Sequence, residues 1–134
     1  MIDWSQISTW RVLLVDDEID NLEVVAESLE FLGTQVCATK NGQEALAKIE
    51  DFKPNLIIAD LSMPVMDGWQ LRTNIKDKAD YRDIPILALS AHAMAGDKER
   101  VLAAGFDGYL TKPVNIHSLL DDIRAAAQEQ TKSK

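Results

Sequence analysis

The chain has 134 residues, of which 46% are hydrophobic and 27% are charged. This length suits one substantial core and is too short for two ordinary domains, so we expect a single domain. The net charge of −8 argues against direct binding to nucleic acid or anionic membranes, which are themselves negative. The sequence has no membrane-length apolar run, no signal-peptide pattern and one cysteine, Cys37, which has no partner for a disulfide. We therefore expect a cytoplasmic protein.

The first predicted strand covers residues 12–15 and runs directly into the acidic residues 16–18. A short apolar run of this kind is typical of a parallel strand that is buried on both faces. Apolar residues then recur at helical spacing over residues 22–29, and Gly33 follows as a helix stop. Residues 1–10 are predicted as an N-terminal extension whose tryptophan rings cover an edge of the core.

A second strand is predicted over residues 35–38, and a second helix continues through Ile49. Asn41 suits the N-cap of this helix, and Glu44, three residues later, completes a capping-box pattern. The chain therefore repeats the order of strand and then helix.

The third predicted strand, residues 56–60, consists of four apolar residues followed by Asp60. A buried parallel strand presents its last residue at the sheet edge where α/β proteins bind their ligands, so Asp60 is a candidate for chemistry. After a loop, Asp67 and Gln70 form a capping-box pattern for a helix over about residues 68–78.

Two more strands are predicted, and each ends next to a polar side chain. Residues 86–89 run into Ser90, and a helix that closes at Gly105 follows. Residues 108–111 form a short fifth strand and lead directly to Lys112.

The last predicted helix is amphipathic and is capped by Asn115. Four residues form its apolar stripe: Ile116, Leu119, Leu120 and Ile123. We take residues 11–127 as the domain and residues 128–134 as a polar C-terminal tail.

Five strands that alternate with five helices predict a doubly wound α/β fold, with a parallel sheet covered by helices on both faces. Ligands of such folds bind beyond the carboxyl ends of the strands. Four of the five strands end in polar groups: Asp16 and Asp17, Asp60, Ser90, and Lys112.

These residue types indicate phosphoryl chemistry. Clustered carboxylates repel one another unless a cation neutralises them, and oxygen ligands without histidine or cysteine favour Mg²⁺. Lys112 and Ser90 can each donate a hydrogen bond to a phosphoryl oxygen. Asp60 is then the natural nucleophile, and it would form an aspartyl phosphate.

Four segments resemble the receiver domain of response regulators, the phosphoacceptor of two-component signalling. They are residues 12–18, 60–68, 88–91 and 109–113, and they occur in the order and at the spacing of that family. The resemblance implies a flavodoxin-like (βα)5 fold with strand order 2-1-3-4-5.

The resemblance also implies a role for each site residue. Asp60 would take a phosphoryl group from the phosphohistidine of a histidine kinase or a histidine phosphotransfer protein. Asp17, Asp60 and the backbone carbonyl of Ser62 would bind Mg²⁺, and Asp16 would act through a water. Ser90 and Lys112 would contact the phosphoryl oxygens.

The family further implies a switch. Ser90 and Tyr109 would move on phosphorylation and alter the surface of the fourth helix, fifth strand and fifth helix. The family also has a cis bond before the proline at Lys112-Pro113, and it uses the position of His92 to tune dephosphorylation.

Several alternatives stay open at this point. The chain resembles a stand-alone response regulator, a monomer or weak dimer with an unknown downstream protein partner, but a receiver excised from a hybrid histidine kinase is the main alternative. An enzyme is less favoured, because phosphatases of the haloacid-dehalogenase type need a second aspartate where this chain has Ser62. A nucleotide or flavin binder needs a loop that cradles phosphate, whereas the loop after the first strand is acidic.

Overall fold

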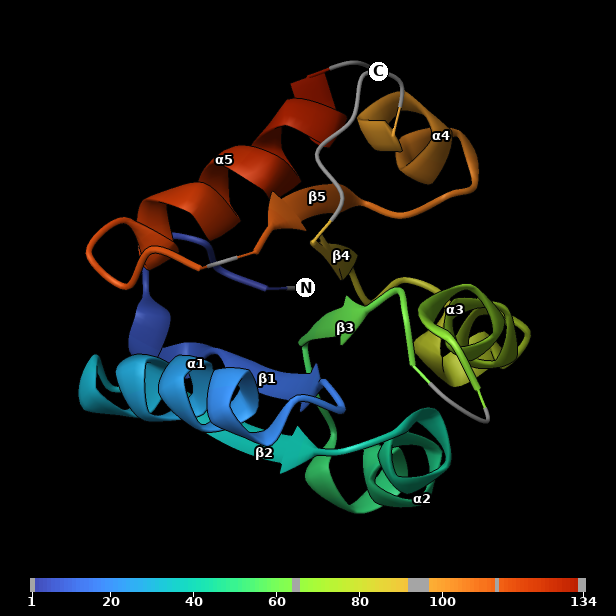
Figure 1. Ribbon diagram of the computed structural model, residues 1–134, viewed down its shortest axis with the longest axis horizontal. Coiled ribbons are helices and arrows are strands. Elements are labelled where there is room, and N and C mark those ends of the chain that lie inside the picture. Colours follow the sequence, from blue (N-terminus) through green and yellow to red (C-terminus); the bar gives the residue numbers. More distant parts are fainter. Residues whose placement is uncertain (1, 64–65, 92–96, 113, 133–134) are drawn as a thin grey trace.

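The computed structural model describes residues 2–63, 66–91, 97–112 and 114–132. Within these residues, five strands alternate with five α-helices (Figure 1). The strands are β1 Arg11–Val15, β2 Gln35–Thr39, β3 Leu56–Asp60, β4 Ile86–Ser90 and β5 Gly108–Thr111. The helices are α1 Ile19–Phe31, α2 Gly42–Phe52, α3 Gly68–Lys76, α4 Asp97–Ala103 and α5 Leu119–Lys132. Two short 3₁₀ helices cover Ile7–Thr9 and Ala79–Tyr81.

The strands form one parallel sheet in the order β2-β1-β3-β4-β5, as predicted. Val12 of β1 pairs with Val36 on one side and with Leu56 on the other. Because β1 has its sequence neighbour β2 on one side and β3 on the other, the chain changes direction across the sheet at β1. The carboxyl ends of β1 and β3 therefore flank the switch point where ligands of this fold class bind.

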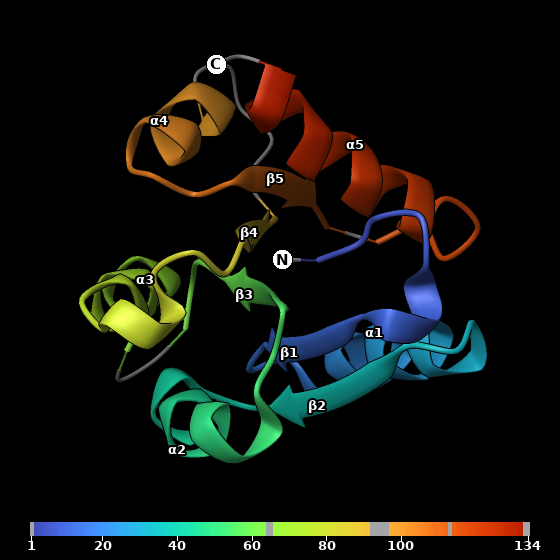
Figure 2. The same cartoon turned by 180° about the vertical axis from the view of Figure 1, so that it is seen from behind.

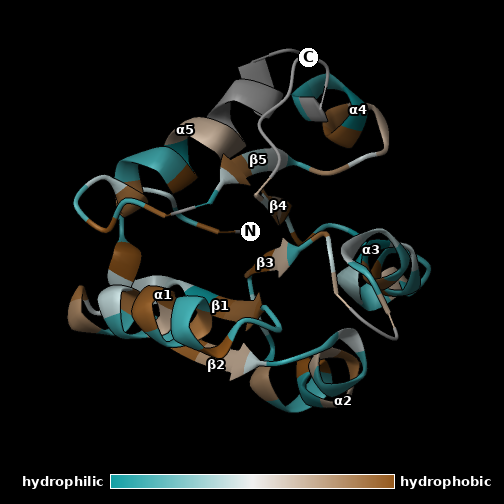
Figure 3. Cartoon of the chain, in the orientation of Figure 1, coloured by the Kyte–Doolittle hydropathy of each residue, from teal (hydrophilic) through white to brown (hydrophobic). Residues whose placement is uncertain are grey.

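The helices cover the two faces of the sheet in two groups (Figures 1 and 2). One core cluster joins residues of α1 and α5 to β1, and the other joins residues of α2, α3 and α4 to the opposite face. The strands are largely hydrophobic, while hydrophilic residues lie on the outer sides of the helices (Figure 3). None of the helices in the described part of the chain has the length and apolar character that crossing a bilayer requires.

Two of the predicted helix caps are present. The Asn41 side chain accepts a hydrogen bond from the Glu44 N–H at the start of α2. Asp67 and Gln70 form a reciprocal capping box at the start of α3. Both helices therefore begin where the sequence predicts.

The predicted start of the last helix is wrong. Asn115 accepts a hydrogen bond from the His117 N–H within a turn, and α5 begins at Leu119. Ile116 consequently lies outside the helix and is 47% exposed. At its other end α5 continues to Lys132, into the segment predicted as a polar tail.

The N-terminal extension packs on the core. The Trp10 ring is fully buried, and its Nε1 donates a hydrogen bond to the Asp3 carbonyl. The Trp4 ring packs edge-on against Trp10, and Arg124 of α5 donates a hydrogen bond to the Trp4 carbonyl. The prediction that tryptophan rings cover a core edge is therefore confirmed, and the extension also ties β1 to α5.

Candidate functional site

Asp60 ends β3, a strand in which every residue is buried. One carboxylate oxygen, Oδ1, accepts a hydrogen bond from the Ser62 N–H at 3.0 Å, and the other, Oδ2, lies 2.8 Å from Lys112 Nζ. The start of α3 presses against this strand end: a Cβ on Gly68 would lie 2.5 Å from the Asp60 carbonyl oxygen. Both carboxylate oxygens of Asp60 are thus oriented by the surrounding chain.

Asp16 and Asp17 follow β1, the neighbour of β3. The buried Asp16 carboxylate accepts hydrogen bonds from the Glu18 N–H and from the Asn21 side-chain amide, whereas Asp17 is exposed. Asp16, Asp17 and Asp60 each offer an oxygen within 4.8 Å of the others. Three carboxylates at this spacing form an oxygen-donor set that fits Mg²⁺, which favours hard oxygen ligands. The three aspartates therefore lie close together, as predicted.

Lys112 reaches the same cluster from the end of β5. Its Nζ lies 2.8 Å from Asp60, 2.6 Å from Glu18 Oε1 and 3.2 Å from Asp16 Oδ2. Burial disfavours the charged ammonium, but hydrogen bonds to Asp60 and Glu18 and the charge of Asp16 outweigh it, so the pKa of Lys112 is raised. Lys112 is a fixed positive charge beside Asp60.

Burial raises the pKa of the Asp60 carboxyl from 3.8 to about 6. The Lys112 ammonium and the Ser62 N–H oppose this rise, and the negative charge of Asp16 adds to it. The pocket as it stands therefore disfavours the charged form of Asp60. An additional cation among the three aspartates would restore that form, which is the nucleophilic one.

Ser90 and Tyr109 lie on the two strands beyond β3. Ser90 is buried at the end of β4, and its carbonyl accepts a hydrogen bond from the Lys112 N–H at 2.9 Å. Tyr109 is half-buried on β5, pairs with Ala88 and packs against the cluster on the α2, α3 and α4 side. Ser90 thus lies at the edge of the sheet that carries the site, whereas Tyr109 lies within β5. His92 and the proline of the predicted cis bond lie outside the described residues.

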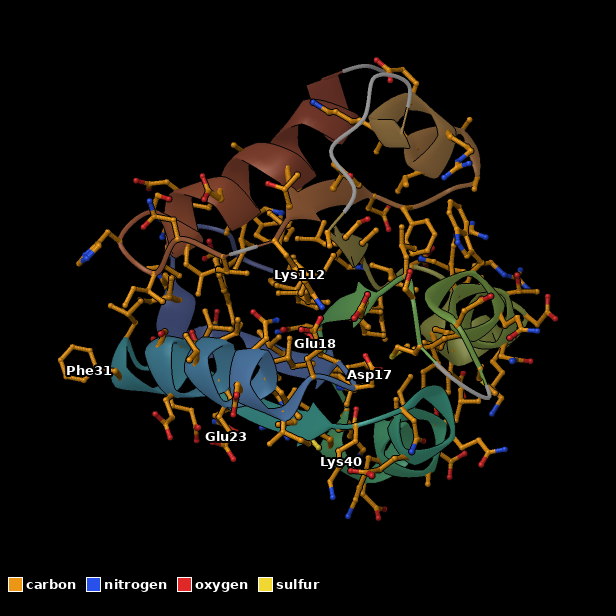
Figure 4. The ribbon with its side chains drawn as sticks, viewed as in Figure 1. Asp17, Glu18, Glu23, Phe31, Lys40 and Lys112 are labelled. Carbon is orange, nitrogen blue, oxygen red and sulfur yellow. The ribbon has the colours of Figure 1, made fainter. Side chains whose placement is uncertain are left out.

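Two residues at the site have no role assigned by the sequence prediction. Glu18 contacts Lys112 (Figure 4), and the Asn21 amide donates a hydrogen bond to the Asp16 carboxylate. Glu18 is the third acidic residue of the segment 16–18 that follows β1, so its residue type and position could have indicated a role at the site. Asn21 lies in the first turn of α1, and only the direction of that helix brings its amide to Asp16.

The comparisons with known proteins agree with this geometry. The family model for the response regulator receiver domain matches residues 12–124. The polar-differentiation response regulator DivK of Brucella anthropi is 32% identical over 114 residues, which cover 85% of this chain and 93% of that protein. The DivK protein of Brucella abortus is 31% identical over 117 residues, covering 87% of this chain and 95% of its own length.

Solved structures show the same fold. The chemotaxis protein CheY4 of Vibrio cholerae has a TM-score of 0.79 at 34% identity and covers 86% of this chain and 96% of its own. The receiver domain of a signal transduction histidine kinase from Syntrophus aciditrophicus has a TM-score of 0.76 at 31% identity, with 90% and 92% covered. Because the family model spans most of the chain and these relatives match it over nearly their whole length, the chain belongs to the response-regulator receiver domains of two-component signalling.

Proposed function

We propose that this receiver domain accepts a phosphoryl group on Asp60 from the phosphohistidine of a histidine kinase or a histidine phosphotransfer protein. The observation that carries the proposal is the 2.8 Å contact between Asp60 Oδ2 and Lys112 Nζ at the edge of a three-carboxylate cluster. It provides an oriented nucleophile with a positive charge beside it. Asp16 is also buried and contacts Lys112, but it lies one residue beyond the end of β1, and its two oxygens already accept hydrogen bonds from the Glu18 N–H and the Asn21 amide.

In the transfer step, an Asp60 oxygen forms a bond to phosphorus while the phosphorus–nitrogen bond of the donor breaks. The electron pair of the broken bond returns to the imidazole nitrogen. Lys112 would donate a hydrogen bond to one phosphoryl oxygen, and the Ser90 hydroxyl, at the end of β4, would donate to another. The Ser62 N–H holds the second Asp60 oxygen in place. Water later cleaves the acyl phosphate and releases inorganic phosphate.

Mg²⁺ is the cofactor that we assign to this site. Asp17 and Asp60 would bind it directly with the backbone carbonyl of Ser62, and Asp16 through a water. When bound, it neutralises the carboxylates and part of the phosphoryl charge. Lys112 alone cannot do this, because it already faces three carboxylates.

The rest of the proposal concerns output. The signal would pass through the surface of α4, β5 and α5 to a downstream protein, and the chain would act as a phosphoacceptor that assists its own phosphorylation and dephosphorylation. A monomer or weak dimer in the cytoplasm remains the expectation. The receivers it resembles include one from a histidine kinase, so attachment to a kinase stays the alternative.

A phosphatase that turns over small phosphate esters is the second candidate, and one experiment separates the two. The chain is incubated with acetyl phosphate and Mg²⁺, and its intact mass is measured with time. We expect one phosphoryl group per chain, none on Asp60→Asn, and an unchanged gain on Asp51→Asn, whose carboxylate lies exposed on α2. An equal gain of phosphoryl mass on Asp60→Asn would overturn the assignment. Rapid hydrolysis of acetyl phosphate without any gain of mass on the chain would favour the phosphatase.

A further inference from the structure

Lys112 has three carboxylate partners, and they differ in how firmly the fold holds them. Asp16 and Asp60 are at most 3% exposed and stand at the ends of β1 and β3. The Glu18 side chain is 63% exposed and comes from the loop before α1, yet its contact of 2.6 Å is the shortest of the three. An ammonium group has three N–H donors, so three such partners use all of them.

Glu18 occupies the N-cap position of α1 without serving as a cap. Among the described residues, its side chain makes no capping hydrogen bond to the helix. It contacts Lys112 instead (Figure 4). Releasing Glu18 would therefore leave the start of α1 intact, because the helix does not depend on that side chain.

A phosphoryl group on Asp60 changes what Lys112 must bind. It brings a charge of about −1.5 to −2 and three acceptor oxygens. Asp60 is the last residue of β3, so a phosphoryl group must reach its carboxylate at the carboxyl edge of the sheet, where the exposed Glu18 side chain also contacts Lys112. Glu18 and the phosphoryl group thus compete for the same outward N–H of Lys112.

We infer that Glu18 is a displaceable partner of Lys112: it holds the ammonium in the unphosphorylated chain, and the phosphoryl group on Asp60 takes its place. The inference rests on the proposed function, since it names a positioning residue for that reaction. Glu18 slows phosphorylation, because its ion pair must break before Lys112 can meet the incoming group. Phosphorylation in turn releases the Glu18 carboxylate into solvent beside α1, next to the pocket.

The test compares two substitutions that remove the same charge. Glu18→Gln removes the ion pair, while Glu23→Gln changes an exposed glutamate on the side of α1 that faces away from Lys112 (Figure 4). Phosphorylation by acetyl phosphate at saturating Mg²⁺ is followed by intact mass after rapid quenching. We expect Glu18→Gln to react about two- to five-fold faster than the native chain, the range for a partly exposed ion pair. Glu23→Gln should match the native rate.

An NMR measurement distinguishes displacement of Glu18 from Lys112 from a general structural effect of the substitution. The Glu18 carboxyl carbon, assigned by its loss in Glu18→Gln, is observed by NMR with and without beryllium fluoride as the phosphoryl mimic, in the presence of Mg²⁺. On addition of the mimic it should move to the position that it has in unphosphorylated Lys112→Met, where no lysine partner exists.

An unmoved resonance, equal rates for the two glutamine variants, or a slower Glu18→Gln would each overturn the inference while leaving Asp60 as the phosphoacceptor. A native chain that takes no phosphate on Asp60 would overturn the proposed function and the inference with it.

Discussion

The Lys112 ammonium and the Asp60 carboxylate meet at 2.8 Å although 52 residues separate them in sequence. Their contact joins the end of β5 to the end of β3 across β4, which lies between these strands in the sheet. A change of charge on Asp60 therefore acts directly on β5. This link explains how chemistry at one strand end can reach a surface made by other elements.

Removal of Mg²⁺ should lower the stability of the chain. A cation at the Asp16, Asp17 and Asp60 oxygens relieves repulsion and binds only the folded state. At ten times the dissociation constant, the melting temperature should rise by about 4–6 °C. Calorimetry with Mg²⁺ and with EDTA measures this shift. Asp17→Ala should lose it and the exposed Asp51→Ala should keep it, while a shift that survives in Asp17→Ala would argue against this metal site.

Asp60→Asn should stabilise the metal-free chain above pH 7. The Asp60 pKa is about 6 in the folded chain against 3.8 for an unperturbed carboxyl, chiefly because of burial. The folded state thus binds this proton more tightly than the unfolded state, and the contribution of Asp60 to stability, complete below about pH 4, is lost as the pH rises through 6. After allowance for solvent screening, we expect Asp60→Asn to gain about 1–2 kcal/mol at pH 7.5.

Urea unfolding in EDTA at several pH values checks this prediction. The difference between Asp60→Asn and the native chain should shrink between pH 7 and pH 4.5, and Asp51→Asn should show no such trend. A difference that grows toward low pH would contradict the raised pKa of Asp60.

The strands and the site edge could be predicted because local residues carried the signal, whereas the strand order came from the resemblance to receiver domains. Apolar runs such as Leu56–Asp60 are buried whatever their partners, and their last residues must share one edge of a parallel sheet. The Asp67 cap is similarly local, since its partner Gln70 lies three residues away. Such features need no knowledge of distant contacts.

The start of α5 and the Glu18 contact could not be predicted in the same way. Asn115 can accept a backbone hydrogen bond either as a helix cap or within a turn, and both uses look alike in sequence. Glu18 could equally have faced solvent, as most glutamates do. Its contact with Lys112 depends on how the end of β5 approaches the β1 edge, and that approach is a property of the whole sheet.

Gly68→Ala should be much more damaging than Gly42→Ala. Both glycines are the first residue of a helix, but a Cβ on Gly68 would meet the backbone of Asp60 at 2.5 Å, whereas one on Gly42 would meet the flexible Met66 side chain at 2.7 Å. The backbone at Asp60 cannot shift away from this Cβ without also displacing the Asp60 carboxylate. We therefore expect Gly68→Ala to lower the free energy of unfolding by about 2–3 kcal/mol and to slow phosphorylation. Gly42→Ala should change stability by less than about 1 kcal/mol. Equal losses in urea unfolding would contradict this account of α3.

Ser90→Ala should uncouple Asp60 from Tyr109 without blocking phosphorylation. Ser90 is buried at the end of β4, and its carbonyl accepts a hydrogen bond from the Lys112 N–H, so a movement of Ser90 toward a phosphoryl oxygen acts on the end of β5. Tyr109 lies three residues before Lys112 on that strand and can respond by changing rotamer, a shift between two states that phosphate biases. The variant should still bind Mg²⁺ and gain one phosphoryl group.

NMR of the Tyr109 ring with and without beryllium fluoride and Mg²⁺ measures this coupling. In the native chain the ring signals should shift, and in Ser90→Ala the shift should fall to less than about half, because one of the two donors to the phosphoryl group is gone. Ser62→Ala serves as the control, since it removes a hydroxyl near Asp60 but keeps the backbone N–H that binds the carboxylate. A full Tyr109 shift in Ser90→Ala, or an equal loss in Ser62→Ala, would show that the signal does not pass through the Ser90 hydroxyl.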